Sequence, residues 1–289
     1  MKNWLVREPQ QNACPAPPQQ WADDLSISPL LLEILWRRGL SERQAMDAFL
    51  TARLDSLTPP DQWPQMPQAA QLLASELLAG KKLAVWGDYD VDGVTAATLV
   101  LDVLESHGII AHWHIPDRRS EGYGLNVPHI EALAAEGCGI LLTVDCGISD
   151  VEAVRRAREL GMTVVVSDHH LPPEELPPAH AICNPRICPA DTLPCPHLAG
   201  VGGAFYLMGA VNAALAPHTG QRHKMDLCLD LVVLGTLADI MPLTGENRIL
   251  VHAGLAHLAM AARPGIAALK VASGMDAKTR LTSGQRSEE

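Results

Sequence analysis

Short apolar runs alternate with longer amphipathic segments through the middle of the chain. The pattern predicts a buried strand at residues 83–87 and further short strands at 111–115, 139–144, 163–166 and 181–183. Helical patterns precede or separate them at residues 68–79, 94–107, 128–136 and 150–160. Strands that alternate in this way with helices are typical of a parallel sheet. The predicted fold class is therefore α/β, with a parallel sheet flanked by helices.

The regions on either side of this alternation have other patterns. Residues 1–65 are rich in proline and glutamine, with short helices expected at 29–38 and 41–50; Ser41 is expected to cap the second, with Gln44 three residues on. Beyond the sheet, helices are expected at 203–215, 225–237 and 248–261. We therefore expect a small helical N-terminal lead-in (1–65), an α/β domain (66–271) and a polar tail (272–289).

Composition and charge limit the classes of function. With 289 residues, 47% of them hydrophobic, the chain can bury a sizeable core. Its net charge of -11 argues against a protein that grips long duplex DNA with its whole surface, because such proteins are normally basic. Any contact with nucleic acid is expected to be local.

Cysteine usage and the apolar runs indicate a cytoplasmic protein. Seven scattered cysteines form no disulfide framework, which fits a reducing compartment. The N-terminus has no basic region followed by an apolar core, so no secretory signal is expected. The uncharged run at 198–216 is interrupted by glycines and an asparagine, and is expected to be a loop and a buried helix rather than a membrane span.

Acidic and histidine residues follow three of the predicted strands. Asp88, Asp90 and Asp92 come after the first strand, Asp145 after the third, and the run Asp168, His169 and His170 after the fourth. Clustered carboxylates repel one another unless a cation lies between them, although the first three could instead form a solvated acidic turn that caps the next helix. Ligands bind beyond the carboxyl ends of parallel strands, and this shared position favours a metal site.

A further carboxylate, Asp239, interrupts an apolar segment. An unpaired carboxylate there would be costly, so Asp239 is expected either to join the site or to act as a helix cap or ion-pair partner. The combined set is rich in carboxylates and poor in histidine, which suits Mn²⁺ or Mg²⁺ better than zinc. Two such ions held ~3.5–4 Å apart support in-line displacement at phosphorus, so the residues themselves indicate phosphoester hydrolysis.

Several spaced motifs resemble those of the DHH phosphoesterases, in the same order. The four main ones are GDYDVDG (87–93), VDCGIS (144–149), SDHHLP (167–172) and GTLADIMPL (235–243). The resemblance extends to RRSEGYGLN (118–126), NPR (184–186), LAGVGGAFYLM (198–208) and ENRIL (246–250), and covers roughly residues 25–270. Within the family it is greatest to exonucleases specific for single-stranded DNA.

The resemblance implies a role for each site residue. Asp90 would bind one ion, the second ion would be bound by Asp92, His169 and Asp239, and Asp145 would bridge both. Asp88 would be an auxiliary ligand or hydrogen-bond partner. Asp168 would orient the histidine pair, and His170 would face the scissile phosphate. Related enzymes often carry a histidine four residues before Asp90, where this chain has Trp86.

The implied reaction is stepwise hydrolysis of single-stranded DNA from its 5′ end, releasing 5′-mononucleotides in DNA repair and recombination. Replication or repair proteins are further expected partners. The phosphate contacts would come from Arg118, Arg119, Arg186 and Arg248, since guanidinium binds phosphate bidentately. Tyr123 would stack on a base. Surface ion pairs for the arginines and core packing for the tyrosine are the alternatives.

Family members continue into a second catalytic-side domain and, commonly, a DNA-binding barrel, and the resemblance fades from Ser273. The chain therefore corresponds to the metal-binding half of such an enzyme. Two other functions stay open. One is a phosphoesterase acting on short oligonucleotides or nucleotide phosphates, and the other is a protein that binds metal or a partner without cleavage.

Overall fold

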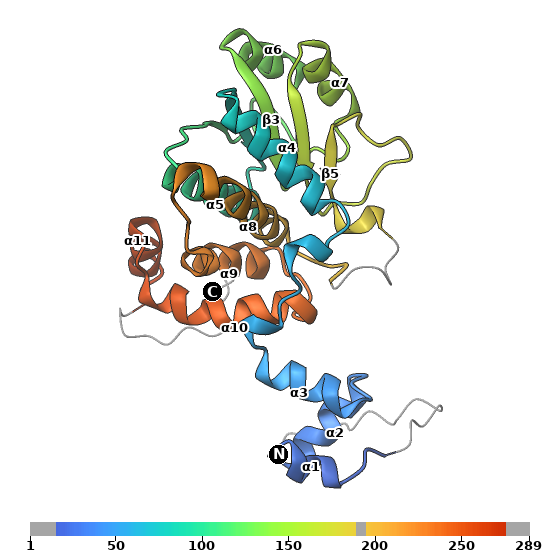
Figure 1. Cartoon of the computed structure of the whole chain (residues 1–289). Helices are drawn as coiled ribbons and strands as arrows, with labels where there is room; N and C mark the ends of the chain where they lie inside the picture. Colours follow the sequence, from blue (N-terminus) through green and yellow to red (C-terminus); the bar gives the residue numbers. More distant parts are fainter. Residues whose placement is uncertain (1–15, 189–194, 276–289) are drawn as a thin grey trace. The chain divides into compact units, whose positions relative to one another are not determined.

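The computed structural model describes residues 16–188 and 195–275, which form two compact units, Met1–Ala52 and Arg53–Glu289 (Figure 1). The division lies before the expected boundary at residue 65, because the segment after Ala52 packs within the second unit. The Thr58 hydroxyl donates to Glu246 Oε1 at 2.7 Å, and the Trp63 ring lies 4.9 Å from that of Tyr206. Residues 276–289, most of the predicted polar tail, lie outside the described residues.

The first unit is a small helical cluster of α1 (Gln20–Asp24), α2 (Pro29–Arg37) and α3 (Arg43–Thr51). Its core is formed by Ala22, Leu32, Leu35 and Met46. Ser28 caps α2 through its hydroxyl. The prediction that Ser41 caps the helix expected at 41–50 is wrong. That helix is α3, which begins at Arg43, and its N-cap is Glu42, which makes no side-chain capping bond.

The second unit is built on a five-stranded sheet, and its strands confirm the predicted fold class. They are β1 (Lys82–Gly87), β2 (His112–His114), β3 (Cys138–Val144), β4 (Thr163–Ser167) and β5 (Ala181–Cys183). The order is β2-β1-β3-β4-β5, and all four neighbouring pairs are parallel. The chain runs outward from β1 in one direction and then crosses back to β3. The switch point of the sheet therefore lies between β1 and β3, the position at which such folds bind ligands.

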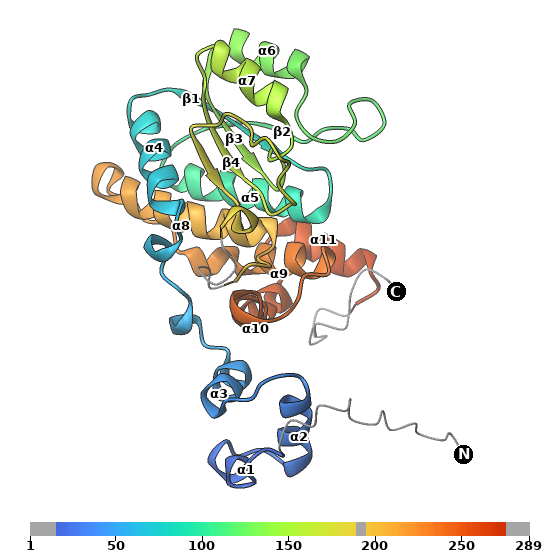
Figure 2. The ribbon, with the colours of Figure 1, turned by 90° about the vertical axis from the view of Figure 1, so that its right-hand side faces the viewer.

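Alternate residues of each strand face opposite layers of helices. Leu83 and Val85 of β1 pack into the core that holds α4 (Met66–Leu78), α5 (Val91–Ser106) and α8 (Gly200–Thr219). Ala84 and Trp86 pack into the core beneath α6 (Val127–Ala135) and α7 (Val151–Glu159). Figures 1 and 2 show these two groups of helices on opposite faces of the sheet.

A further helical layer packs against α5 and α8. The 3-10 turn Met225–Cys228 leads into α9 (Leu229–Ala238), which is followed by α10 (Gly245–Met260) and α11 (Pro264–Ala272). Shorter 3-10 turns occur at Leu54–Ser56, Pro60–Gln62 and Pro185–Ile187. The sequence pattern did not predict α11. Arg263 precedes it and pairs with Asp102 on α5 and Asp230 on α9.

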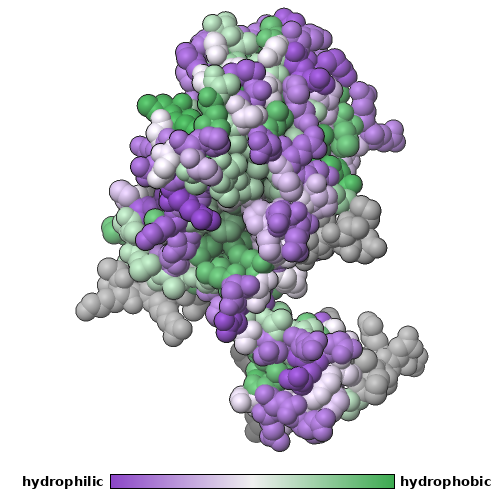
Figure 3. Space-filling model, in the orientation of Figure 1, coloured by the Kyte–Doolittle hydropathy of each residue, from purple (hydrophilic) through white to green (hydrophobic). Residues whose placement is uncertain are grey.

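The uncharged run at 198–216 corresponds to α8. In the described part of the chain, α8 is the one single helix whose length and composition would suit a membrane span; α10 and α11 would qualify only together, across an 82° bend. More than half of α8 is buried, and it packs against α4 and α5, as expected for a core helix. Figure 3 shows that hydrophilic residues cover much of the surface of the second unit around α6 and α7.

Candidate metal centre

The acidic and histidine residues gather at the carboxyl edge of the sheet. Asp88 directly follows β1, Asp145 follows β3 and Asp168 follows β4. The backbone N–H of Asp145 donates to Ser167 O at 2.9 Å, and that of Asp168 donates to Cys183 O at 3.0 Å, so the sheet continues one residue past its strands. The three side chains therefore leave adjacent strands at the same edge.

The loop after β1 is compact because a glycine lies against its backbone. A Cβ at Gly93 would come 2.6 Å from the carbonyl oxygen of Asp88. The Asp90 carboxylate caps α5 by accepting the Gly93 N–H at 3.0 Å. Helix capping, one of the two interpretations left open by the sequence, is thus part of the role of Asp90.

Asp92, unlike Asp90, accepts hydrogen bonds from the first amides of a helix that is distant in sequence. Its two carboxylate oxygens accept the N–H groups of Gly200 and Val201, at 2.7 and 2.8 Å, at the start of α8. Asp92 is buried, and a side chain at Gly235 would collide with it. Burial, followed by nearby carboxylates, raises the pKa of Asp92 to about 7, against the opposing effect of the two amides.

Asp145 is the buried carboxylate of the centre with the fewest hydrogen bonds. Its backbone is left-handed, with φ of 62°, a conformation that aspartate tolerates better than most residues. Both carboxylate oxygens are buried and accept no well-formed hydrogen bond, although His169 Nε2 lies 3.0 Å from Oδ1. Burial and the neighbouring carboxylates, Asp92 first, raise the pKa of Asp145 well above its usual value. A buried carboxylate without well-formed hydrogen bonds is expected to be costly unless a cation accompanies it.

His169 lies among three of these carboxylates. Its Nε2 atom is 3.0 Å from Asp145 Oδ1, 3.6 Å from Asp239 Oδ2 and 3.8 Å from Asp92 Oδ2. Burial and the adjacent His170 lower the pKa of His169 to about 4, so the imidazole is neutral near pH 7 and can act as a ligand. Asp239 ends α9 as its C-cap and remains partly exposed.

Asp168 holds the second histidine of the pair. Its Oδ1 accepts both the backbone N–H of His170, at 3.0 Å, and a hydrogen bond from His170 Nδ1, at 2.7 Å. Its Oδ2 accepts the Ile148 N–H at 2.9 Å. Burial opposes ionisation of Asp168, but these donors outweigh it and lower the pKa of the carboxyl. The same contact raises the pKa of His170, which favours a protonated ring.

The donor groups fall into three overlapping sets that fit metal ions. Asp92, His169 and Asp239 each place a ligand atom within 4.8 Å of the others, and so do Asp88, Asp90 and Asp145. The third set, Asp145, His169 and His170, shares a residue with each of these two. Oxygen donors with one imidazole are the chemistry that Mn²⁺ and Mg²⁺ prefer. The Asp145 oxygens, which accept no well-formed hydrogen bond, fit the same conclusion.

Three of the residues expected to bind substrate lie close to this centre. The Tyr123 hydroxyl is 3.5 Å from His170 Nδ1, and its side chain is half-exposed. The exposed Arg186 donates from Nε to His169 O at 2.6 Å. The guanidinium of Arg118 lies over the Tyr89 ring, 5.4 Å from its centroid.

Arg119 and Arg248 are the other two residues expected to bind substrate. Arg119 is exposed beside Arg118, and its backbone N–H donates to Asp117. Arg248 is half-buried in α10, one residue after Asn247, whose side chain donates to His197 O at 2.6 Å. Burial lowers the pKa of Arg248.

Two parts of the centre were not predicted from the sequence. The first is the pair of amides, from Gly200 and Val201, that hold Asp92, although the glycines of LAGVGG indicated a close approach. The second is Tyr89, whose ring lies edge-on to that of Tyr123 at 6.3 Å. Within the GDYDVDG motif, this tyrosine stood between two more conspicuous carboxylates.

The fold and this centre define a parallel α/β protein with a carboxylate-rich candidate metal site at the switch point of its sheet. The model of the DHH family, N-terminal domain, matches residues 82–236, just over half of the chain. The chain therefore belongs to the DHH family.

Its relatives within the family are exonucleases. It is 34% identical over 273 residues to the single-stranded-DNA-specific exonuclease RecJ of Bacillus subtilis, covering 94% of this chain and 33% of the relative. It is 39% identical to the RecJ of Haemophilus influenzae, covering 86% and 43%. The chain thus spans less than half the length of these curated relatives.

Solved RecJ structures share the fold. A crystal structure of exonuclease RecJ bound to manganese matches with a TM-score of 0.66 and 34% identity, covering 76% of this chain and 56% of that one. RecJ of Thermus thermophilus in complex with Mn²⁺ matches with a TM-score of 0.72 and 29% identity, covering 91% and 38%.

Proposed function

We propose that this chain is the metal-binding part of a phosphoesterase that hydrolyses single-stranded DNA from its 5′ end and releases 5′-mononucleotides. The observation that carries the proposal is Asp145, a buried carboxylate that groups with Asp88 and Asp90 and also lies 3.0 Å from His169 Nε2 of a second set of ligands. The sequence identity of the chain to exonucleases specific for single-stranded DNA supports the choice of substrate.

In this proposal the carboxylates and one imidazole hold two ions, Mn²⁺ or Mg²⁺. Asp90, assisted by Asp88, would hold one ion, Asp92, His169 and Asp239 would hold the other, and Asp145 would serve as a ligand to both. When bound, the ions polarise the phosphate and supply a nucleophilic water near neutral pH. The amides of Gly200 and Val201 fix the direction of the Asp92 carboxylate and so preorganise its set of ligands.

His170 and Asp168 are proposed to handle the leaving group. Asp168 accepts from Nδ1 of His170, which fixes the ring and favours its protonated form. The water oxygen bonds to phosphorus and the bond from phosphorus to the 3′ oxygen of the terminal nucleotide breaks. A proton from His170 then neutralises that oxygen. The products are a 5′-mononucleotide and a strand shortened by one nucleotide.

Tyr123 and the arginines are proposed to hold the strand. Tyr123 can stack on a base because its half-exposed ring lies beside His170, and such stacking contributes roughly 1–3 kcal/mol. Arg118, Arg119, Arg186 and Arg248 are proposed as phosphate contacts. A few local arginines are compatible with a net charge of -11, since the strand would be gripped only at the centre.

Incubation of the purified chain with Mn²⁺ and a 5′-labelled single strand tests the proposal. Wild type is expected to release labelled mononucleotide. The rate of Asp145→Asn is expected to be at least ~10²-fold lower, because both activation of the water and stabilisation of the phosphate depend on the bound ions. Glu175→Gln, at an exposed ion pair, is the matched control and is expected to retain full activity. Equal rates for wild type and Asp145→Asn would contradict it.

A second candidate is a phosphoesterase that acts on short oligonucleotides or nucleotide phosphates with the same ions. It is favoured by the net charge of -11, because an acidic surface is poorly suited to holding a long strand. Turnover of dinucleotides well above that of long strands would support it. Tight Mn²⁺ binding without turnover of either would indicate a protein that binds metal or a replication or repair partner.

We also propose a cytoplasmic location. All six cysteines in the described part of the chain are free thiols, which fits a reducing compartment.

A further inference from the structure

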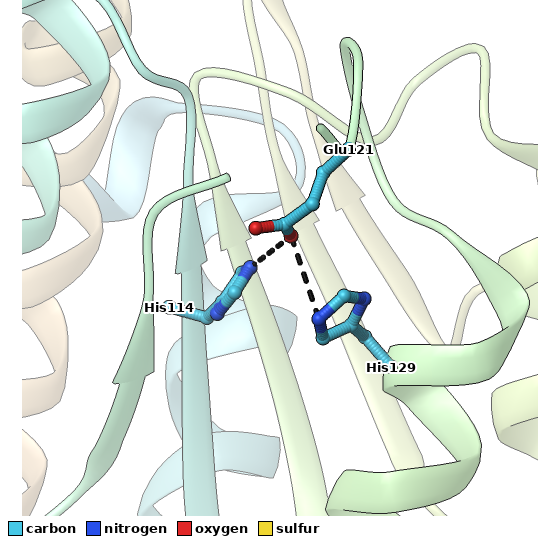
Figure 4. Close-up of side chains that lie close together, drawn as sticks. All are labelled: His114, Glu121 and His129. Carbon is cyan, nitrogen blue, oxygen red and sulfur yellow. Dashed lines mark hydrogen bonds and ion pairs between the residues drawn. The ribbon is translucent and has the colours of Figure 1, made fainter. Parts of the chain in front are cut away.

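A second cluster of metal-ligating side chains lies apart from the carboxylates, on the α6 side of the sheet. His114 ends β2, Glu121 lies in the loop that follows, and His129 lies in the first turns of α6. Figure 4 shows the carboxylate of Glu121 pointing between the two imidazole rings. Glu121 Oε2 is 2.7 Å from His114 Nε2 and 3.5 Å from His129 Nε2. One ligand atom from each residue lies within 4.8 Å of the other two.

We propose that His114, Glu121 and His129 bind a single Zn²⁺ ion. Two imidazoles and one carboxylate form a ligand set in which zinc keeps a fourth position for water. Zinc bonds of 2.0–2.2 Å in a tetrahedron place ligand atoms about 3.3 Å apart, so small side-chain adjustments bring these three into range. The proposal is independent of the proposed exonuclease activity.

The groups around the cluster already orient it for metal binding. His129 Nδ1 donates to Asn126 Oδ1 at 2.6 Å, which leaves Nε2, the atom facing Glu121, as the free lone pair of the neutral ring. A ligating histidine usually donates its other ring N–H to an oxygen in this way. The Asp117 N–H donates to Glu121 Oε1 at 3.2 Å and leaves Oε2 for the ion.

Ionisation and packing also suit a zinc site. The bond from Asp117, and then that from His114, lower the pKa of Glu121, so the carboxylate is charged near neutral pH. The His114 ring packs 4.3 Å from the ring of Trp86 and 4.8 Å from that of His129, which limits its rotation. The three side chains remain 27%, 19% and 41% exposed, so an ion and a water molecule can reach them.

The ion would join three elements on one side of the proposed DNA site. Glu121 lies two residues before Tyr123, whose hydroxyl is 3.5 Å from His170 Nδ1. A metal bond from Glu121 to β2 and α6 would therefore hold the loop that carries Tyr123.

Zinc stoichiometry tests the proposal. The full chain is dialysed against Zn²⁺, and bound metal per protein is measured for wild type, Glu121→Gln and His129→Gln, each shown to be folded by circular dichroism. Zn²⁺ held by the carboxylate centre is the same in all three and cancels in the comparison. Wild type is expected to bind one equivalent more than either variant.

Glu131→Gln, on an exposed face of α6 where Glu131 pairs with Arg156, is the matched control and is expected to bind as wild type does. Equal zinc content in wild type, Glu121→Gln and His129→Gln would overturn the proposal. The result is separable from the exonuclease assay, because neither variant changes a proposed ligand of the carboxylate centre.

Discussion

Two buried aspartates in the centre differ in how their charge is compensated. Asp92 accepts a backbone N–H at each oxygen, from Gly200 and Val201, whereas Asp145 accepts none and has only His169 Nε2 close to one oxygen, at 3.0 Å. Asp92 can therefore remain in place without an ion, while Asp145 depends on one. This difference makes Asp145 the more sensitive indicator of metal binding.

The raised pKa values predict how the stability of the metal-free protein depends on pH. The Asp92 pKa is about 7 in the folded state and about 3.9 in the unfolded state, so the folded state binds more protons between these values. The free energy of unfolding of EDTA-treated protein is therefore expected to fall by roughly 2–4 kcal/mol as pH rises from about 4 to 8. Urea unfolding at a series of pH values measures it.

Two comparisons make this prediction specific. Asp92→Asn is expected to reduce the pH dependence, because the asparagine side chain does not ionise while Asp145, whose pKa is also raised, still does. Saturating Mn²⁺ is expected to remove the pH dependence, since the ions favour the charged carboxylates. A metal-free wild type that becomes more stable on going to pH 8 would contradict the assignment.

Gly93 is expected to be intolerant of any side chain. A Cβ at this position would meet backbone atoms of Asp88, which cannot move without displacing the end of β1. Gly93→Ala should destabilise the protein by roughly 1–3 kcal/mol in urea unfolding. Gly265→Ala, in the first turn of α11 with nothing within 4 Å, is the control and should be neutral or slightly stabilising. Similar losses at both positions would rule out the close approach as the cause.

At the scale of elements, Arg263 joins three helices. It pairs with Asp102 on α5 and with the buried Asp230 on α9, and it precedes α11. Arg263→Ala leaves Asp230 buried without its partner, so the free energy of unfolding should fall by roughly 1–3 kcal/mol.

The control for Arg263 is Arg155→Ala. Arg155 pairs with Glu175 at an exposed site, where ion pairs contribute little, and a change within about 0.5 kcal/mol is expected. Comparable losses for the two variants in chemical unfolding would show that burial of Asp230 is not what makes Arg263 important.

Alternation of apolar runs and helical patterns was enough to predict the sheet. All five strands lie where expected, with ends shifted by at most a residue. Four of them are short, mostly buried runs, whereas β2 (His112–His114) is largely exposed at the edge of the sheet. Helix starts were harder to place. The helix expected at 203 begins at Gly200, where its first amides donate to Asp92, a residue more than a hundred positions earlier. α11 was missed because it is short and lies close to the polar tail.

The convergence of the candidate ligands was predictable for the same reason. Parallel strands place Asp88, Asp145 and Asp168 at one edge, whatever the loops between them do. Asp239 was less predictable, since it comes from a helix end, and its association with His169 depends on how α9 packs. The contact of Arg118 with Tyr89 was not predictable, because it depends on a loop conformation.

At the scale of the whole molecule, the described chain combines a complete parallel sheet with one carboxylate-rich centre at its switch point. The sequence match to RecJ exonucleases extends over 94% of this chain for the Bacillus subtilis relative but only 33% of that relative. Metal binding is therefore the property that can be tested most directly in this chain. An assay of cleavage of long strands tests in addition whether the chain is active without the other parts of its relatives.

Calorimetric titration of Mn²⁺ into the metal-free chain tests the central claim most directly. Wild type is expected to bind two ions, and Asp145→Asn to lose at least one of them, because Asp145 is proposed to contact both. Glu175→Gln should bind as wild type does. Undiminished binding of both ions by Asp145→Asn, or no Mn²⁺ binding by wild type, would contradict the assignment of the carboxylate edge as a two-metal centre.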